Sequence, residues 1–227
     1  TGSNSAADVN TQVALSLIDN AGRSAGAGLY NNGRPLCRTF NAWRNGVTVS
    51  DGAVLMPARL TDGGSDGASD TIVFTAGRAQ GALSSLPVVA AMADANASLV
   101  VSGGGVINDG DYALIGVPVD PALLPPPPAV PCTLIQLTAA PTPQSTAAAC
   151  GGNASRCQTL ARAGSSTGAN PSVASAAFSN PVTYGFANDA GAGVSGPAVV
   201  NRLGGDFRQT AFRVMCNSLV TYNAYSD

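Results

Sequence analysis

The first 29 residues carry a helical pattern of apolar and polar positions that the rest of the chain lacks. At about 100° per residue, apolar side chains fall on one broad arc and charged side chains on the opposite arc. The sequence therefore predicts one amphipathic helix that begins near Ser5 and leaves through a glycine-rich exit ending at Leu29. We expect its packing face, which lies on a β-sheet, to consist of Val9, Val13, Leu17, Ile18 and Ala21.

The polar positions in this segment agree with a helix. Ser5 can cap the N-terminus, and Asp8 lies in the first turn, where the helix dipole favours a negative charge. Asp19 and Arg23 are four residues apart, which is the spacing of an ion pair along one helix face. Glycines from Gly22 onward favour termination of the helix.

Beyond residue 30 the pattern changes to short β-branched or alternating runs separated by Gly, Asn, Asp and Pro, which predict strands. The runs are 47–54, 71–75, 97–101, 112–117 and 132–138. Residues 207–215 and 218–223 alternate around a turn at Cys216-Asn217 and predict a hairpin. Residues 139–196, low in charge and rich in small side chains, predict a long irregular insertion. We expect an α+β fold with a helix over 1–29 and a β-rich domain over 30–227.

The helix exit and four later segments also carry a family resemblance. The helix exit reads LIDNAGRSAGAGLY (17–30), and the later segments are GASDTIVFTAGRA (67–79), GDYALIGVP (110–118), CTLIQLT (132–138) and FRVMCNSLVTY (212–222). In this order they resemble the PilW family of type IV pilus minor pilins, which is related to the larger minor pseudopilins of type II secretion. The resemblance implies a pilin-like α+β fold, in which the N-terminal helix packs on antiparallel sheet, and a role in the complex that initiates the pilus.

The resemblance also implies partners and a location. The chain starts at Thr1 without the apolar half-helix and cleavage motif of pilins, so we expect it to be the soluble half of a longer protein. That missing apolar helix would anchor the protein in the inner membrane, facing the bacterial periplasm, before assembly into an extracellular pilus, with a position at the tip. The expected partners are other minor pilins and the major pilin.

Composition argues independently against an enzyme. The 11 basic residues are all Arg, the 13 acidic residues are all Asp, and the chain has no His. Without His it has no ordinary general base near neutral pH and no imidazole metal ligand, and without Lys it has no Schiff-base amine. We therefore expect no catalytic residue and no cofactor site. The net charge of −2 provides no overall attraction to nucleic acid.

The five cysteines predict disulfides and therefore an oxidising compartment. Cys150 and Cys157 enclose the segment GGNASR, where a short-loop disulfide would restrict an otherwise flexible segment, and we expect them to pair. Cys37 can pair with Cys132 or with Cys216, and the sequence does not choose between them.

Residues 23–59 form a weak candidate for DNA binding, because five arginines stand against one aspartate and alternate with aromatic residues. The candidate residues are Arg34, Arg38, Trp43 and Arg44. The alternative is that Phe40 and Trp43 pack in the core while the arginines are solvated, and the scarcity of large aromatics favours this alternative.

A second weak candidate is a calcium site in the loop DGGSDGASD, formed by Asp62, Asp66 and Asp70. Carboxylates in a glycine-rich loop suit calcium, but the spacing differs from an EF-hand and the final Glu is absent, which favours a solvated acidic loop.

Two classes of function follow from these patterns. The leading hypothesis is a structural minor pilin that supports pilus biogenesis, with twitching, adhesion or DNA uptake as indirect consequences. The alternative is a binding protein at the pilus tip. It would act as a DNA receptor through the arginine-rich segment, or as an adhesin through the insertion at 139–196. A type II secretion pseudopilin shares the assembly logic of the first hypothesis.

Overall fold

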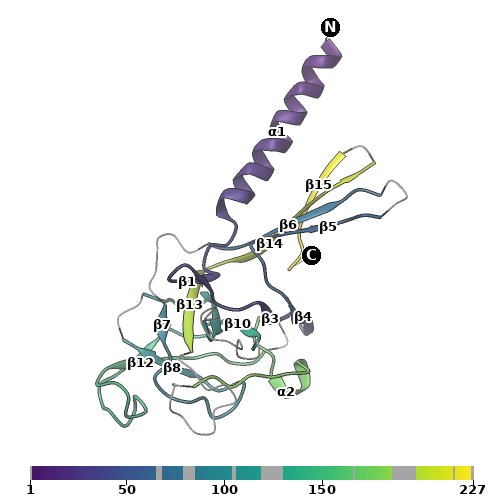
Figure 1. The fold of residues 1–227 in the computed structure, drawn as a ribbon. Coiled ribbons are helices and arrows are strands. Elements are labelled where there is room, and N and C mark those ends of the chain that lie inside the picture. The colour runs from purple at the N-terminus through teal and green to yellow at the C-terminus, as the bar shows by residue number, and fades with distance from the viewer. Residues whose placement is uncertain are drawn as a thin grey trace, which may run out of the picture. The chain divides into compact units, whose positions relative to one another are not determined.

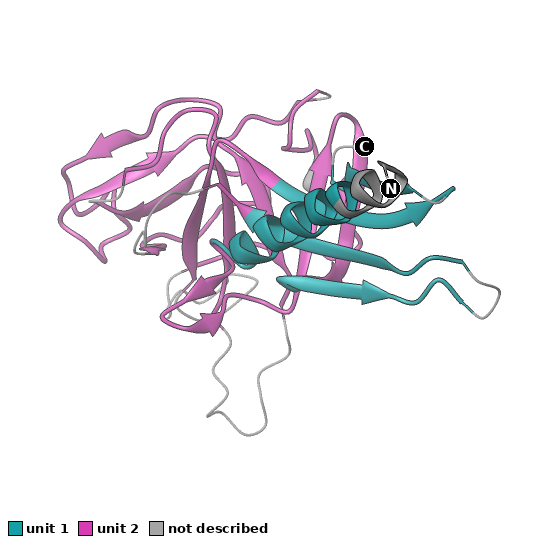
Figure 2. Ribbon diagram, turned by 90° about the horizontal axis from the view of Figure 1, so that it is seen from above, with its two compact units in different colours: residues 1–27, 56–76, 208–227 teal, residues 28–55, 77–207 magenta. Residues whose placement is uncertain are grey.

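The chain folds into two compact units that interleave along the sequence (Figure 2). The computed structural model describes residues 2–64, 68–78, 85–103, 106–118, 130–165, 167–185, 198–216 and 218–225. Unit 1 combines residues 1–27, 56–76 and 208–227, and unit 2 combines residues 28–55 and 77–207. The helical pattern marks α1 as one element, but it contains no signal that the helix shares a unit with two distant β segments.

Strands dominate the fold, so the expected α+β, pilin-like class is wrong. The one long helix is α1 (Gly2–Ser24), and the short α2 covers Ala174–Ala177. The described strands outside unit 1's sheet are β1 (Tyr30–Asn31), β2 (Arg34–Pro35), β3 (Thr39–Arg44), β4 (Val47–Val54), β7 (Leu86–Pro87), β8 (Leu99–Ser102), β9 (Tyr112–Gly116), β10 (Cys132–Gln136), β11 (Thr142–Gln144), β12 (Cys157–Leu160) and β13 (Val199–Gly204). The sheet of unit 1 is formed by β5 (Ala58–Thr61), β6 (Thr71–Gly77), β14 (Phe207–Met215) and β15 (Ser218–Asn223).

Unit 2 is built on a six-stranded sheet of order β4-β3-β10-β9-β13-β7 and a three-stranded sheet of order β11-β12-β8 (Figure 1). A bridge between Val88 and Val101 joins the two sheets beside β7. The central strands β9 and β10 are nearly continuous apolar runs, which is typical of strands covered on both faces. Their side chains Ile115 and Ile135 join Leu99 and Leu160 from the smaller sheet in one hydrophobic core.

Part of the expected irregular insertion is regular. Of residues 139–196, 142–144 form β11 and 157–160 form β12, and β12 is the middle strand of its sheet. The pattern C-Q-T-L in β12 is too short and too weakly apolar to stand out in a segment rich in Ala, Ser and Gly. Its strand character comes from pairing with β8, in which Gln158 lies opposite Val101.

Unit 1 contains the helix and a sheet of order β15-β14-β6-β5. The predicted C-terminal hairpin is confirmed: β14 and β15 pair antiparallel from Thr210–Asn223 to Met215–Ser218. Cys216 in the turn has φ of 48°, the left-handed conformation that two-residue hairpin turns require.

The helix packs on this sheet only at its C-terminal end, so most of the predicted packing face is wrong. Ile18 and Ala21 are half-buried, whereas Val9, Val13 and Leu17 are 57%, 54% and 48% exposed. The reason lies in the side chains beneath. Near Gly22, the ring of Phe74 fills the space between helix and sheet and contacts the ring of Phe212, with centroids 6.1 Å apart. Towards the hairpin turn the sheet offers only smaller side chains, and α1 diverges from it (Figure 1).

Candidate assembly surface

An open groove lies between α1 and the β14–β15 hairpin of unit 1. Its volume is about 500 Å³, and its apolar lining comes from Val13, Ala14, Leu15 and Leu17 of the helix and from Val214 and Leu219 of the hairpin. The groove forms where the apolar arc of the helix continues past the two phenylalanine rings without a side chain large enough to meet it. It is therefore an uncovered apolar surface built from two elements far apart in sequence.

The sheet side of this groove follows from strand register. Residues directly opposite in an antiparallel pair point to the same face, so Leu219 shares a face with Val214, and Thr221 shares it with Phe212. The contact between Phe212 and Phe74 extends that face to β6. We call it the helix-side face, because Gly22 of α1 approaches Phe74 on it.

The helix-side face continues across β6 to the other edge of the sheet. Ile72 of β6 lies opposite Leu60 of β5, and Phe74 lies opposite Ala58. Leu60 is 68% exposed, the most exposed large apolar side chain in the described part of the chain. The uncovered apolar surface thus includes this edge of the sheet as well as the groove.

The opposite face of the same sheet is more polar. There the guanidinium of Arg213 lies over the ring of Tyr222, 5.5 Å from its centroid. On the helix, Arg23 and Asp19 form the predicted ion pair at 2.7 Å, but both side chains are largely exposed and such pairs contribute less than about 1 kcal/mol. The exposed Leu60, Val214 and the groove residue Leu219 thus share the helix-side face.

The weak DNA-binding candidate lies in unit 2 and is only partly assembled. Arg34 in β2 and Arg38 after it are exposed, whereas Trp43 and Arg44 in β3 are half-buried. Phe40 is buried and meets Phe207 edge-on with ring centroids 6.2 Å apart, which confirms the alternative in which it packs inside. Tyr30 in β1 is an exposed aromatic residue, and the next residue, Asn31, lies opposite Arg34 of β2.

Arg44 lies within electrostatic range of a half-buried phenol, Tyr112. Burial raises the pKa of Tyr112, and the positive charge of Arg44 opposes that rise. Arg44 is therefore half-buried within electrostatic range of this phenol.

The calcium candidate is only partly within the described residues. The Asp62 carboxylate accepts the N–H of Gly64, and the Asp70 carboxylate accepts the N–H of Gly63, so both close their own loop. Asp66 lies outside the described residues. Elsewhere in the described ranges, no cluster of three or more potential metal ligands occurs.

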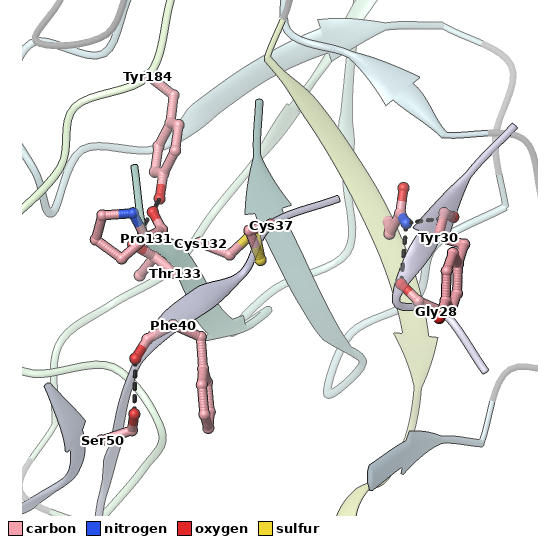
Figure 3. The surroundings of a disulfide bond; sticks show 10 residues. Gly28, Tyr30, Cys37, Phe40, Ser50, Pro131, Cys132, Thr133 and Tyr184 are labelled. Atoms are coloured by element: carbon pink, nitrogen blue, oxygen red, sulfur yellow. Dashed lines mark hydrogen bonds between the residues drawn. A yellow bond between two sulfur atoms is a disulfide. The ribbon is translucent and has the colours of Figure 1, made fainter. Parts of the chain in front are cut away.

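The two disulfides lie in unit 2. Cys150 pairs with Cys157, which confirms the prediction, and Cys37 pairs with Cys132, which resolves the choice left open by the sequence. Figure 3 shows the Cys37–Cys132 bond, which attaches the segment before β3 to the first residue of β10. Cys216 is a free, exposed thiol. In unit 2, Asn201 donates 2.9 Å hydrogen bonds to the carbonyls of Gly28 and Tyr30, which fixes the chain that follows the helix.

Two buried polar residues escaped the sequence analysis because no spacing marks them. Tyr184 is fully buried and donates to the carbonyl of Pro131 at 2.7 Å (Figure 3), and burial raises its pKa. Arg162 donates to the carbonyls of Ala97 and Ala95, and burial lowers its pKa to about 10. Their bonds to backbone carbonyls tie loops together and offer no open reaction site.

The described helices include none with the length and hydropathy needed to cross a membrane. Comparisons of the chain with protein-family models, with curated protein sequences and with solved structures give no significant match.

Proposed function

We propose that this chain is a structural subunit of a type IV pilus-like assembly, acting as a minor pilin whose helix packs against neighbouring subunits. The observation that carries the proposal is the exposure of the apolar arc of α1. Val9, Val13 and Leu17 are each about half exposed, and Val13 and Leu17 line an open groove. Uncovered apolar surface of this kind marks interaction sites in folded proteins.

The energetics favour coverage of this surface. Full burial of an exposed Val or Leu side chain contributes roughly 1.5–3 kcal/mol, and about half of each of these three side chains is still exposed, so their coverage would contribute about half that amount each. The helix presents them at positions 9, 13 and 17, spaced as one turn-by-turn row that a second helix can meet ridge into groove. A neighbouring pilin helix is the partner whose shape fits this row.

Other features support an extracytoplasmic structural role over catalysis. Two disulfides suit the oxidising periplasm, and the chain lacks His, the side chain that most often serves as a general base, as well as Lys and Glu. Within this proposal the protein is not an enzyme, needs no cofactor, and has the other minor pilins and the major pilin as partners. A pseudopilin of type II secretion would use the same helix in the same way.

The test compares two double variants of α1 in the full-length protein within a pilus-forming host. Val13→Asp with Leu17→Asp places charges on the exposed apolar arc. The matched control, Gln12→Asp with Ser16→Asp, adds the same charge at exposed helix positions outside the groove lining. We expect the first pair to abolish copurification with minor pilins and recovery in sheared filaments, while the control retains both. Equal assembly by the two variants, each shown to be folded by its thermal unfolding curve, would reject the proposal.

A further inference from the structure

We infer that a second copy of this chain adds to the sheet of unit 1 by strand pairing, with β5 of one copy beside β15 of the next. In the described residues, the order β15-β14-β6-β5 leaves the outer edge of each terminal strand without a paired strand. The inference goes beyond the proposed function, since it concerns the edges of the sheet and not the arc of α1.

The outer edge of β15 offers backbone hydrogen-bonding groups and no barrier to pairing. Ala224 donates its N–H to the carbonyl of Gln209, so the alternate residues Ser218, Val220 and Tyr222 face β14 and Leu219 and Thr221 face outward. The strand SLVTYN contains no charge, Pro or Gly. Natural edges are commonly protected by such residues, and their absence makes β15 a good template for strand addition.

The outer edge of β5 has the complementary arrangement. Thr75 donates its N–H to the carbonyl of Pro57 at 2.8 Å, so Arg59 and Thr61 face β6 and the backbones of Ala58 and Leu60 face outward. All four residues of β5 are exposed. Pairing of this edge would cover Leu60, which solvent now contacts over most of its side chain.

On both edges, the residues whose backbone groups face outward have their side chains on the same face of the sheet. The outward-facing residues of β5, Ala58 and Leu60, have side chains on the helix-side face, and so do the outward-facing Leu219 and Thr221 of β15. Hydrogen-bonded neighbours in a sheet point to the same face. The helix-side face therefore continues from copy to copy, and Leu60 of one copy comes beside the floor of the next copy's groove.

Self-pairing of either edge covers less surface. Two copies of β5 paired through Ala58 and Leu60 would place Arg59 directly opposite Arg59, which is destabilising. Two copies of β15 could pair, but that arrangement leaves β5 and Leu60 exposed. Only pairing of β5 with β15 covers both edges. Because the two edges differ, this pairing joins copies head to tail, and each added copy leaves one free β5 edge and one free β15 edge at the ends of the assembly.

The experiment blocks one edge at a time with proline. Thr221→Pro and Leu60→Pro each remove an outward N–H that bonds nothing within the sheet, a position where edge strands tolerate proline. Every variant also carries Cys216→Ser, so that oxidation of this exposed thiol cannot mimic association. Thr221→Asp and Leu60→Asp provide a second pair if proline impairs folding. Association is measured by sedimentation equilibrium over a wide concentration range.

We expect the Cys216→Ser chain to associate beyond the dimer as concentration rises, and each edge variant to stay monomeric. An equimolar mixture of the two edge variants should form a dimer and nothing larger, because one open β15 remains to meet one open β5. A dimer formed by Leu60→Pro alone would show β15 self-pairing and overturn the inference. A Cys216→Ser chain that stays monomeric at every concentration would also overturn it, and neither result bears on the α1 variants that test the proposed function.

Discussion

The backbone N–H of Gly26 donates a 2.8 Å hydrogen bond to the carbonyl oxygen of Thr75, which attaches the end of α1 to β6. Gly26 has φ of 85°, a left-handed conformation that lets the chain leave the helix at this point. Together with the contact of Gly22 on Phe74, this bond holds the C-terminal end of α1 on the sheet while the opposite end extends away.

Two alanine substitutions should separate these roles. Gly26→Ala should lower the free energy of unfolding by about 1–2 kcal/mol, because the methyl group is strained at positive φ. Gly22→Ala should raise it by up to about 1 kcal/mol, since alanine favours the helix and its methyl would lie at an ordinary 3.7 Å from the Phe74 ring. Urea unfolding followed by circular dichroism measures both. Shifts of the same sign would contradict the assigned helix end.

Truncation of the helix arc should affect stability far less than truncation of the core. Leu17→Ala removes a side chain that is 48% exposed and should cost under about 1 kcal/mol in the isolated chain. Leu99→Ala removes a side chain that is 0% exposed from the unit 2 core and should cost about 2–5 kcal/mol. Thermal unfolding of both variants checks this, and a comparable loss in each would show that Leu17 is covered in solution.

The helix illustrates how far the sequence pattern reaches. An amphipathic period identifies which side chains share an arc, and the predicted helix and its Asp19–Arg23 pair are present. Its predicted start is wrong, because α1 begins at Gly2, so Ser5 lies inside the helix and Asp8 beyond its first turn. The period does not say what covers the arc, and here Phe74 and Phe212 reach only its C-terminal end. The hairpin was predictable to its exact bounds because its pairing is local and its alternation is clear.

Contacts between distant segments were not predictable in the same way. Cys132 in β10 lies opposite Phe40 of β3 in a parallel ladder of unit 2's large sheet, and that pairing is what brings Cys37 to Cys132. No local signal specifies a parallel neighbour so far along the chain. The Cys150–Cys157 bond was predictable because the short loop between the two cysteines brings them together by itself.

The two disulfides should differ in their contribution to stability. In the loop-entropy model, a sequence separation of 95 contributes about 4–5 kcal/mol and a separation of 7 about 2–3 kcal/mol. Replacement of both cysteines by serine should therefore lower the free energy of unfolding more for Cys37–Cys132 than for Cys150–Cys157, as measured by urea unfolding.

Mass spectrometry of a non-reducing digest should recover both bonds and a free Cys216, and any other pairing would contradict the structure.

The buried phenol of Tyr184 should make the fold sensitive to alkali. Burial raises its pKa above the ordinary value of 10.0, so the unfolded chain loses this proton first and the stability falls as pH rises above 10. Tyr184→Phe should cost about 1–3 kcal/mol at neutral pH, because the Pro131 carbonyl and Thr133 lose a buried partner. Its stability should then fall less steeply above pH 10. Parallel pH profiles in urea would show that Tyr184 does not titrate differently in the two states.

DNA binding by this chain should be weak and should depend on arginine alone. The chain has no Lys or His, its net charge is −2, and of the aromatics near the candidate arginines Phe40 is buried and Trp43 is half-buried. Electrostatic binding to double-stranded DNA weakens with salt by a slope of about 0.9 per phosphate contact, so exposed Arg34 and Arg38 could account for a slope of only about 2. Fluorescence anisotropy of labelled DNA across a salt series measures that slope.

Replacing Arg34, Arg38 and Arg44 with Gln should leave copurification with partner pilins intact, because none of the three lies in unit 1. Tight binding with a much steeper slope, lost in the triple variant, would instead favour the receptor hypothesis over the structural one.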